Sequence, residues 1–220
     1  MNVAHPRVGV LSLQGDFACH RATVEALGVE AVRVTLPRDL AGCDALVMPG
    51  GESTTMLRLL QVAGLRAPLE AFVREKPVLG TCAGVILLGR GGGGLPAAAL
   101  GVLDVAVERN AYGRQIDSFT ASIDVTPLGR PMQGVFIRAP RLTAVGAGVE
   151  VIARLTAAHG PAPAGEPVGV RAGHIVGLCF HPELTHDAAL HAWFLHDVAG
   201  LALPGGTAAL TRERASRARE

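Results

Sequence analysis

Lysine is nearly absent from this chain of 220 residues, since Lys76 is the one lysine among 20 basic residues and the others are arginines. It lies in a charged turn, Arg74-Glu75-Lys76-Pro77, where water would solvate it. Chemistry that passes through an imine needs a desolvated lysine. We therefore expect that this protein does not act on carbonyl compounds through a Schiff base.

The chain also lacks a charge excess and a long apolar run. Its formal net charge is +1, which argues against a general nucleic-acid binder, because such a protein needs a concentrated basic face. The uncharged run at residues 80–89 is half of the ~20 residues that a membrane helix needs. Residues 8–13 are apolar but too short for a signal peptide, and polar residues follow at once. We expect a cytoplasmic protein with neither nucleic acid nor membrane as a partner.

Cysteine pairs with the spacing of metal ligands are missing too. The four cysteines are Cys19, Cys43, Cys82 and Cys179. No CxxC pair occurs among them, so a zinc ribbon is not supported. Because the chain is neither small nor evidently secreted, reduced thiols are expected in place of disulfides.

Three histidines near the end of the chain recur every five residues, at His186, His191 and His196. Five positions turn a helix about 140° beyond a full turn, so these side chains do not share one face. We expect surface or half-buried histidines here, with no metal and no cofactor bound by the chain.

What is present is an alternation of strand and helix patterns. In the first half, strand patterns at residues 8–13, 29–36, 45–48 and 77–80 alternate with helical ones at 16–27, 54–63, 68–74 and 83–88. This order predicts an α/β fold with a doubly wound parallel sheet. The second half is richer in strands, at 102–108, 118–125, 134–137, 149–155, 168–171 and 175–180, before a last helix at 186–199. Loops are expected at 91–94 and 160–167, and the chain is predicted to form one domain over 1–200 with a polar tail over 201–220.

The sharpest local feature is the run Gly80-Thr81-Cys82-Ala83-Gly84, in which a short strand ends and a helix begins. It matches the nucleophile elbow G-x-nucleophile-x-G, with cysteine in place of serine. Such a turn lifts the sulfur above the carboxyl end of the sheet, where the helix N-terminus favours thiolate and backbone N–H groups can hold an oxyanion. A buried structural cysteine in a tight turn is the alternative.

A proton donor for that nucleophile is predicted at His181, which follows the strand at 175–180. Glu183 lies two residues further on, and residues two apart in extended chain point the same way, so its carboxylate can orient the imidazole as in a catalytic triad. Ligands of open parallel sheets bind at the carboxyl ends of the strands. Cys82 and His181 both fall at that edge by separate arguments. A capping or core histidine is the alternative for His181 alone.

A second glycine turn, Pro49-Gly50-Gly51-Glu52-Ser53, also follows a short strand. Its peptide N–H groups could complete an oxyanion hole at the same edge. Phosphate binding is the alternative, but neither GxGxxG nor GK[ST] occurs.

Together these segments resemble the glutaminase subunit of pyridoxal 5′-phosphate synthase, a family of triad-type glutamine amidotransferases. The segments that carry the resemblance are VLSLQG (10–15), PGGESTT (49–55), GTCAG (80–84), ERNAYGRQIDSF (108–119), FIRAP (136–140) and CFHPELT (179–185). GTCAG and HPE are shared with other amidotransferases, whereas PGGESTT, RNAYGRQ and FIRAP are specific to this family.

The resemblance implies a single flavodoxin-like α/β/α domain of three layers with a mostly parallel central sheet. It also implies hydrolysis of L-glutamine to glutamate and ammonia, which passes to a synthase subunit in a hetero-oligomer that builds the vitamin B6 cofactor. The implied roles are Cys82 as nucleophile, His181 as general acid and base, Glu183 as its orienter, the N–H groups of Gly51 and Ala83 as oxyanion hole, and Gly50, Gly51, Glu52, Arg109, Ile137 and Arg138 as glutamine-binding residues. The synthase subunit of the family carries the lysine-bound intermediates, which fits the single lysine here.

Two other functions stay open at the level of the residues. The first is a peptidase or deglycase that uses the same cysteine elbow. The second is a non-catalytic subunit that scaffolds a complex, although the set Cys82, His181 and Glu183 argues against it.

Overall fold

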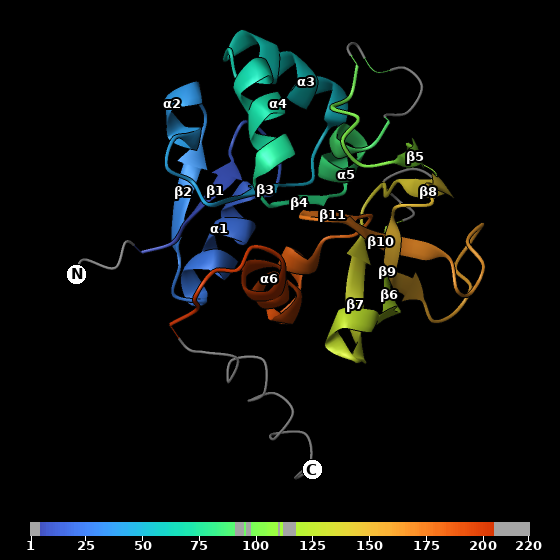
Figure 1. The fold of residues 1–220 in the computed structure, drawn as a ribbon. Helices are drawn as coiled ribbons and strands as arrows, with labels where there is room; N and C mark the ends of the chain where they lie inside the picture. Colours follow the sequence, from blue (N-terminus) through green and yellow to red (C-terminus); the bar gives the residue numbers. More distant parts are fainter. Residues whose placement is uncertain (1–4, 91–94, 96–97, 110, 112–117, 205–220) are drawn as a thin grey trace.

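The computed structural model describes residues 5–90, 95, 98–109, 111 and 118–204. Its strands are β1 (Arg7–Leu11), β2 (Glu30–Val34), β3 (Ala45–Met48), β4 (Val78–Thr81), β5 (Val105–Glu108), β6 (Phe119–Val125), β7 (Arg130–Phe136), β8 (Arg141–Val145), β9 (Glu150–Leu155), β10 (Pro167–Ala172) and β11 (Ile175–Leu178). Nine of them form one sheet in the order β2-β1-β3-β4-β11-β10-β9-β6-β7, and β5 pairs with β8 in a second sheet (Figure 1).

Helices lie on both faces of this sheet. They are α1 (Phe17–Ala26), α2 (Pro37–Leu40), α3 (Ser53–Val62), α4 (Arg66–Glu75), α5 (Ala83–Leu88) and α6 (Ala189–Trp193), the last continued by a π-helix over Phe194–Val198. In Figure 1, α3, α4 and α5 lie above the strands and α1 and α6 lie below them. The α/β fold predicted from the alternation, and its three layers, which the resemblance implies, are confirmed.

The parallel part of the sheet is the centre of the core. Strands β2, β1, β3, β4 and β11 run parallel in that order. Every residue of β3, β4 and β11 is buried, because helices cover both faces of these strands and leave no side of them for water. Their apolar sequences are therefore continuous rather than alternating.

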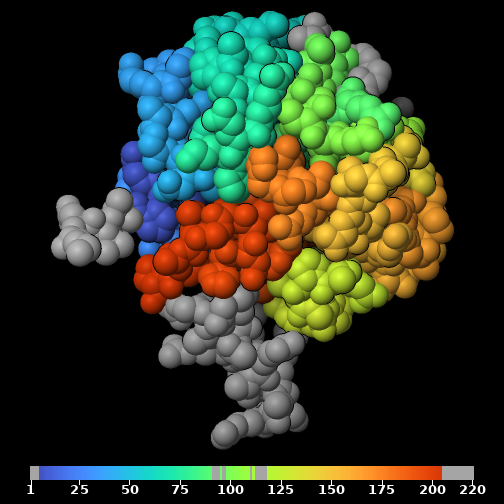
Figure 2. Space-filling view, viewed as in Figure 1, coloured from blue at the N-terminus to red at the C-terminus, as the bar shows by residue number. Residues whose placement is uncertain are grey.

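Beyond β11 the sheet continues with antiparallel neighbours, β10, β9, β6 and β7. Here burial alternates along β6 and β7, as expected when one face of an antiparallel sheet meets solvent. Figure 2 shows the end of the described chain (red) on the same side of the molecule as the yellow-green β6–β7 hairpin, and α6 packs beside the turn Thr126–Leu128 that joins these strands.

Several elements differ from the sequence prediction, and among them α2 was not predicted. Strand β8 follows a proline-containing turn and was not predicted. The last helix begins at Ala189 instead of residue 186. The Asp187 carboxylate accepts a hydrogen bond of 3.0 Å from the Ala189 backbone N–H, which satisfies one of the free N–H groups of the first helical turn.

The four cysteines are free thiols, as predicted. Within the described ranges, no helix combines the length and the apolar character that crossing a bilayer requires. The predicted loop at 91–94 and residues 205–220 of the predicted tail lie outside the described residues.

Candidate active site

Cys82 occupies the sharp turn between β4 and α5. Its backbone has φ 47° and ψ −104°, in the left-handed half of conformational space that non-glycine residues rarely adopt. A side chain on Gly80 would overlap the backbone of Gly84, and one on Gly84 would overlap the carbonyl group of Met48. The glycines of the pentapeptide therefore make room for a strained elbow, as the pattern predicted.

The pairing of β4 with β11 brings His181 to the same edge as Cys82. Thr81 is in register with Leu178, and the Cys82 N–H donates to the Leu178 carbonyl over 2.8 Å. Chain continuation then places His181 three residues beyond Leu178, beside the elbow. The His181 N–H donates to the Val135 carbonyl of β7 over 2.8 Å, which ties the imidazole to the antiparallel part of the sheet.

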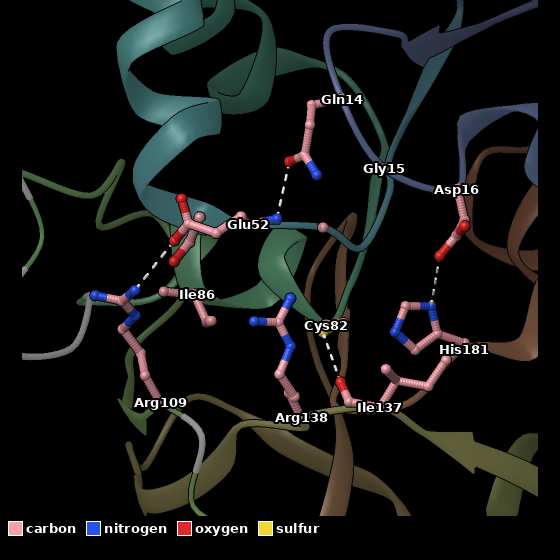
Figure 3. A pocket seen from close by; sticks show the side chains of 12 residues that line it. Gln14, Gly15, Asp16, Glu52, Cys82, Ile86, Arg109, Ile137, Arg138 and His181 are labelled. Atoms are coloured by element: carbon pink, nitrogen blue, oxygen red, sulfur yellow. Dashed lines mark hydrogen bonds and ion pairs between the residues drawn. The ribbon is translucent and has the colours of Figure 1, made fainter. Parts of the chain in front are cut away.

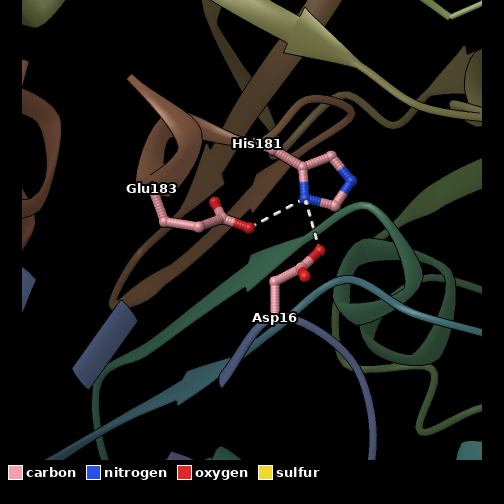
Figure 4. A group of neighbouring side chains, drawn as sticks. All are labelled: Asp16, His181 and Glu183. Carbon is pink, nitrogen blue, oxygen red and sulfur yellow. Dashed lines mark hydrogen bonds and ion pairs between the residues drawn. The ribbon is translucent and has the colours of Figure 1, made fainter. Parts of the chain in front are cut away.

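The imidazole of His181 is oriented by Glu183. The His181 Nδ1 atom lies 2.8 Å from Glu183 Oε1, a hydrogen-bond distance, and 3.7 Å from Asp16 Oδ2, which is beyond it (Figure 4). Glu183, and not Asp16, is thus hydrogen-bonded to Nδ1, and Nε2 is the ring nitrogen that remains for the Cys82 sulfur. Burial opposes protonation of His181, but its hydrogen bonds with Cys82 and Glu183 and their charges raise its pKa to about 10. The imidazole is therefore protonated at neutral pH and can supply a proton to a leaving group.

Glu183 stays ionised although its side chain is fully buried. Burial acts to raise the pKa of this carboxyl, but the electrostatic interaction with the nearby His20 and the hydrogen bond from His181 hold it well below its ordinary value. Asp16, His181 and Glu183 offer ligand atoms within 4.8 Å of one another. The hydrogen bond that joins His181 to Glu183 already engages two of these three side chains.

A cavity of about 240 Å³ opens in front of the sulfur (Figure 3). Its lining residues are Gln14, Gly15, Asp16, Gly51, Glu52, Ser53, Cys82, Ile86, Arg109, Ile137, Arg138 and His181. Figure 3 shows the side chains of Arg109 and Arg138 directed toward the part of the cavity that holds Glu52. A cavity with two guanidinium groups and two carboxylates suits a small zwitterion.

Glu52 lines this cavity and also begins α3. Its Oε1 accepts from the Thr54 N–H over 3.0 Å, and its Oε2 accepts from the Thr55 N–H over 2.6 Å. Arg109 Nη2 lies 3.3 Å from Oε1 and 3.2 Å from Thr54 Oγ1. Partial burial raises the pKa of Glu52, but the hydrogen bonds from Thr55 and Thr54 outweigh it and lower the pKa to about 2. The carboxylate is therefore charged and fixed by the helix cap.

The antiparallel part supplies two residues that follow β7. The Cys82 Sγ atom lies 3.8 Å from the Ile137 carbonyl oxygen. Arg138 has φ 43° and is, with Cys82, one of two non-glycine residues of the described chain with positive φ. Strained backbone concentrates at functional sites, and here both strained residues face one cavity.

Most of the predicted site residues come together, but three lie behind the cavity lining. Gly50 backs the His181 ring, since a side chain on Gly50 would overlap the imidazole. Ala83 is the first residue of α5, and Glu183 lies behind His181. The predicted roles of these residues and of Gly51, Glu52, Arg109, Ile137 and Arg138 remain predictions.

Sequence reasoning missed Gln14, whose Oε1 accepts from the Glu52 N–H over 2.8 Å and whose side chain fills the space where a side chain on Gly51 would lie. The sequence feature that could have identified Gln14 is its position after β1, at the carboxyl edge of the sheet, where ligands of such sheets bind. The expectation of surface or half-buried histidines was wrong for His191, which is buried. Its partner is His20 on α1, 171 residues away, and no pattern along the chain reveals such a contact.

Comparisons with known proteins point to one family of enzymes. A model of the SNO glutamine amidotransferase family matches residues 10–208. The chain is 48% identical over 196 residues to pyridoxal 5′-phosphate synthase subunit PdxT of Deinococcus radiodurans, covering 86% of this chain and 95% of that protein. It is 45% identical over 198 residues to PdxT of Corynebacterium jeikeium, covering 87% of this chain and 96% of that protein.

Solved structures show the same fold. A crystal structure of a glutamine amidotransferase superposes with a TM-score of 0.79 at 45% identity, covering 88% of this chain and 99% of that one. A glutamine amidotransferase of Thermotoga maritima superposes with a TM-score of 0.56 at 15% identity, covering 88% of this chain and 83% of that one. The second likeness concerns the fold alone.

Proposed function

From the premise that the chain belongs to the SNO glutamine amidotransferase family, we propose that it is the glutaminase subunit of pyridoxal 5′-phosphate synthase. It hydrolyses L-glutamine and supplies ammonia for synthesis of the cofactor. The observation that carries this proposal is the register of β4 and β11, which sets His181, with Glu183 hydrogen-bonded behind it, beside the elbow of Cys82.

In the mechanism, the Cys82 sulfur attacks the side-chain amide carbon of glutamine. The negative charge on the amide oxygen is held by the N–H groups of Gly51 and Ala83, since oxyanion donors of this kind stabilise the tetrahedral intermediate. Protonated His181 gives its proton to the departing nitrogen, which leaves as ammonia. A γ-glutamyl thioester on Cys82 remains.

The second half of the reaction runs through the same histidine. Now neutral, His181 accepts a proton from water, and the resulting hydroxide attacks the thioester. Glutamate leaves, and the proton on His181 restores the starting state. Glu183 keeps the imidazole in the tautomer with its proton on Nδ1, so that Nε2 can give and take protons.

Substrate recognition follows from the charges of the cavity. The α-carboxylate of glutamine suits the guanidinium groups of Arg109 and Arg138, and Ile137 adds an apolar contact. Glu52 acts through Arg109, because its own oxygens are occupied by the α3 cap.

The partner is the synthase subunit, with which the chain forms a hetero-oligomer. Ammonia that escaped into water would be protonated and lost as a nucleophile, so a direct route between the two subunits is favoured.

The test is ammonia release from L-glutamine, measured with and without a pyridoxal 5′-phosphate synthase subunit. We expect release that rises when the synthase subunit is added. Cleavage of peptides or glycated amines, with no glutamine turnover under either condition, would instead support another cysteine hydrolase. Lack of any turnover, together with no labelling of Cys82 by a glutamine-mimicking electrophile, would support a scaffold.

A further inference from the structure

Two histidines lie behind Glu183, on the side away from the cavity. His20 on α1 is fully buried, and His191 on α6 is only 1% exposed. The His20 Nδ1 atom lies 2.9 Å from His191 Nε2. His20 Nε2 lies 3.1 Å from Thr81 Oγ1 and 3.2 Å from Glu183 Oε2. An unbroken series of polar contacts thus runs from the catalytic imidazole through Glu183 to α1 and α6.

The two oxygens of Glu183 have different partners. Oε1 accepts the aligned hydrogen bond from His181. Oε2 is within ion-pair distance of His20 Nε2, but the N–H direction there favours Thr81, so Oε2 has no aligned hydrogen bond among the described residues. A buried carboxylate oxygen without a hydrogen bond is costly, and the polar His20 Nε2 atom at 3.2 Å offsets part of this cost by electrostatic attraction.

The tautomers follow from these contacts. A lone pair on His20 Nε2 would face the Glu183 carboxylate at 3.2 Å and be repelled, so Nε2 carries a proton. Burial and the nearby His20 lower the pKa of His191 to about 3, although the charges of Glu183 and Asp187 oppose this. His191 is therefore neutral and donates from Nε2 to Nδ1 of His20, leaving its own Nδ1 as an acceptor without a partner among the described residues. The core therefore contains one acceptor without a partner among the described residues, the Nδ1 atom of His191, while the Nε2 atom of the same ring donates to His20.

We propose that His20 is a positioning residue of the glutaminase, which holds Oε2 of Glu183 so that Oε1 stays on Nδ1 of His181. This inference rests on the proposed function, because it assigns His20 to the same reaction. His191 supports it by fixing the His20 ring from the far side. His20 does not reach the cavity and touches no substrate; it acts through Glu183 alone.

A pair of variants separates this role from simple core packing. In His20→Gln, the side-chain amide nitrogen reaches about as far as Nε2 and can still donate to Glu183. In His20→Asn, the amide reaches only as far as Nδ1 and can meet His191 but not Glu183. We expect His20→Gln to keep kcat within about threefold of the wild type, and His20→Asn to lower kcat about 10- to 100-fold with little change in KM, the effect of removing the N–H group that lies beside a buried charged oxygen.

A double-mutant cycle with Glu183→Gln measures whether the loss of kcat in His20→Asn depends on Glu183. A purely structural role of His20 would give the same loss in both backgrounds. If His20 acts through Glu183, His20→Asn costs less than about twofold in the Glu183→Gln background. The His181 Nδ1 proton, observed by NMR in the full chain, should shift upfield in His20→Asn and stay near its wild-type position in His20→Gln. Equal losses in both backgrounds, or equal kcat for the two His20 variants, would overturn the proposal.

The matched control is His174→Asn, at the opposite end of β11. This half-buried histidine also makes one hydrogen bond, 3.2 Å from Nε2 to the Val73 carbonyl, and its loss should leave kcat unchanged. All assays use the complex with the synthase subunit. If the wild-type complex releases ammonia and His20→Asn matches it, this inference alone fails; if the wild type releases none, the proposed function fails.

Discussion

The parallel and antiparallel parts of the sheet contribute to the site in different ways. Strands β4 and β11 are buried along their whole length and end at Cys82 and near His181. Strands β6 and β7 are half exposed, and β7 ends just before Ile137 and Arg138. The groups proposed to react thus follow strands that helices enclose on both faces. Two of the residues proposed to bind substrate, Ile137 and Arg138, follow a strand with one face toward water.

This difference has a physical basis. A nucleophile and its acid must be held within a fraction of an ångström, which a close-packed core achieves. Substrate-binding groups tolerate small displacements, because their contribution is spread over several contacts. The hydrogen bond from the His181 backbone N–H to the Val135 carbonyl joins the parallel and antiparallel parts of the sheet. Mutations in each part can therefore test the difference between them.

The largest effect is expected for Cys82→Ala in the parallel part. Without the sulfur no thioester forms, so ammonia release should fall at least about 10⁴-fold even with the synthase subunit present. Glutamine binding, measured by calorimetry, should persist. Undiminished ammonia release would refute the assignment of the nucleophile.

Glu183→Gln should follow, with a fall in kcat of about 10³- to 10⁴-fold, as when the carboxylate of a serine protease triad is replaced by an amide. The charge of Glu183 helps to raise the pKa of His181 to about 10. Its loss lowers that pKa, so His181 loses its proton at lower pH. A pH–rate profile should therefore show the alkaline limb moved toward neutrality, and an unmoved limb would contradict the role of Glu183.

Gly50→Ala tests the packing behind the His181 imidazole, the proposed general acid and base. The new methyl group would overlap the His181 ring, and displacing that ring by about 1 Å is expected to lower kcat about 100-fold. Gly148→Ala, in the turn before β9, meets no atom within 4 Å and is the matched control. Similar kcat values for the two variants would show that the position of the imidazole does not depend on Gly50.

A smaller effect, on binding, is expected from the antiparallel part. Arg138→Ala removes a guanidinium group from the cavity and should raise KM for glutamine about tenfold, with kcat within about threefold of the wild type. Arg154→Ala, which loses an exposed hydrogen bond to the Gly165 carbonyl, should leave both constants unchanged. A fall in kcat with unchanged KM would place Arg138 in the chemical step instead.

The smallest effect concerns stability. Glu52→Gln weakens the α3 cap and should lower the free energy of unfolding at pH 7 by about 0.5–1 kcal/mol. Because the pKa of Glu52 is lowered from 4.5 to about 2 in the folded state, its stabilising contribution is complete above pH 4.5 and is lost as pH falls toward 2. Urea titrations should show the two proteins converging over that range, and a difference independent of pH would contradict this origin.

Much of the fold could be read from local patterns. The apolar run of β3 and the helix after the elbow were located to the residue, because continuous buried strands and a glycine elbow have strong local signals. Strand β8 and the start of α6 were missed, since they depend on pairing with β5 and on the side chain of Asp187. The predicted bounds of helices and strands were wrong where a contact with a distant residue or a side-chain hydrogen bond, and not the local sequence preference, decides them.

The site shows the same division. Cys82, His181 and Glu183 follow from residue type and spacing beside predicted strand ends. Gln14 and His20 do not, because their partners lie 38 and 171 residues away and only the folded chain brings them together.

The order of residues by itself determined the elbow, the His-x-Glu spacing and the alternation that makes a parallel sheet, since each depends on neighbours along the chain. Tertiary structure alone decided which strand lies beside β4, that Gln14 meets Glu52 and which buried histidine lies beside the Glu183 carboxylate. Such contacts join distant segments, and they are selected by the packing of the whole core and not by any local preference.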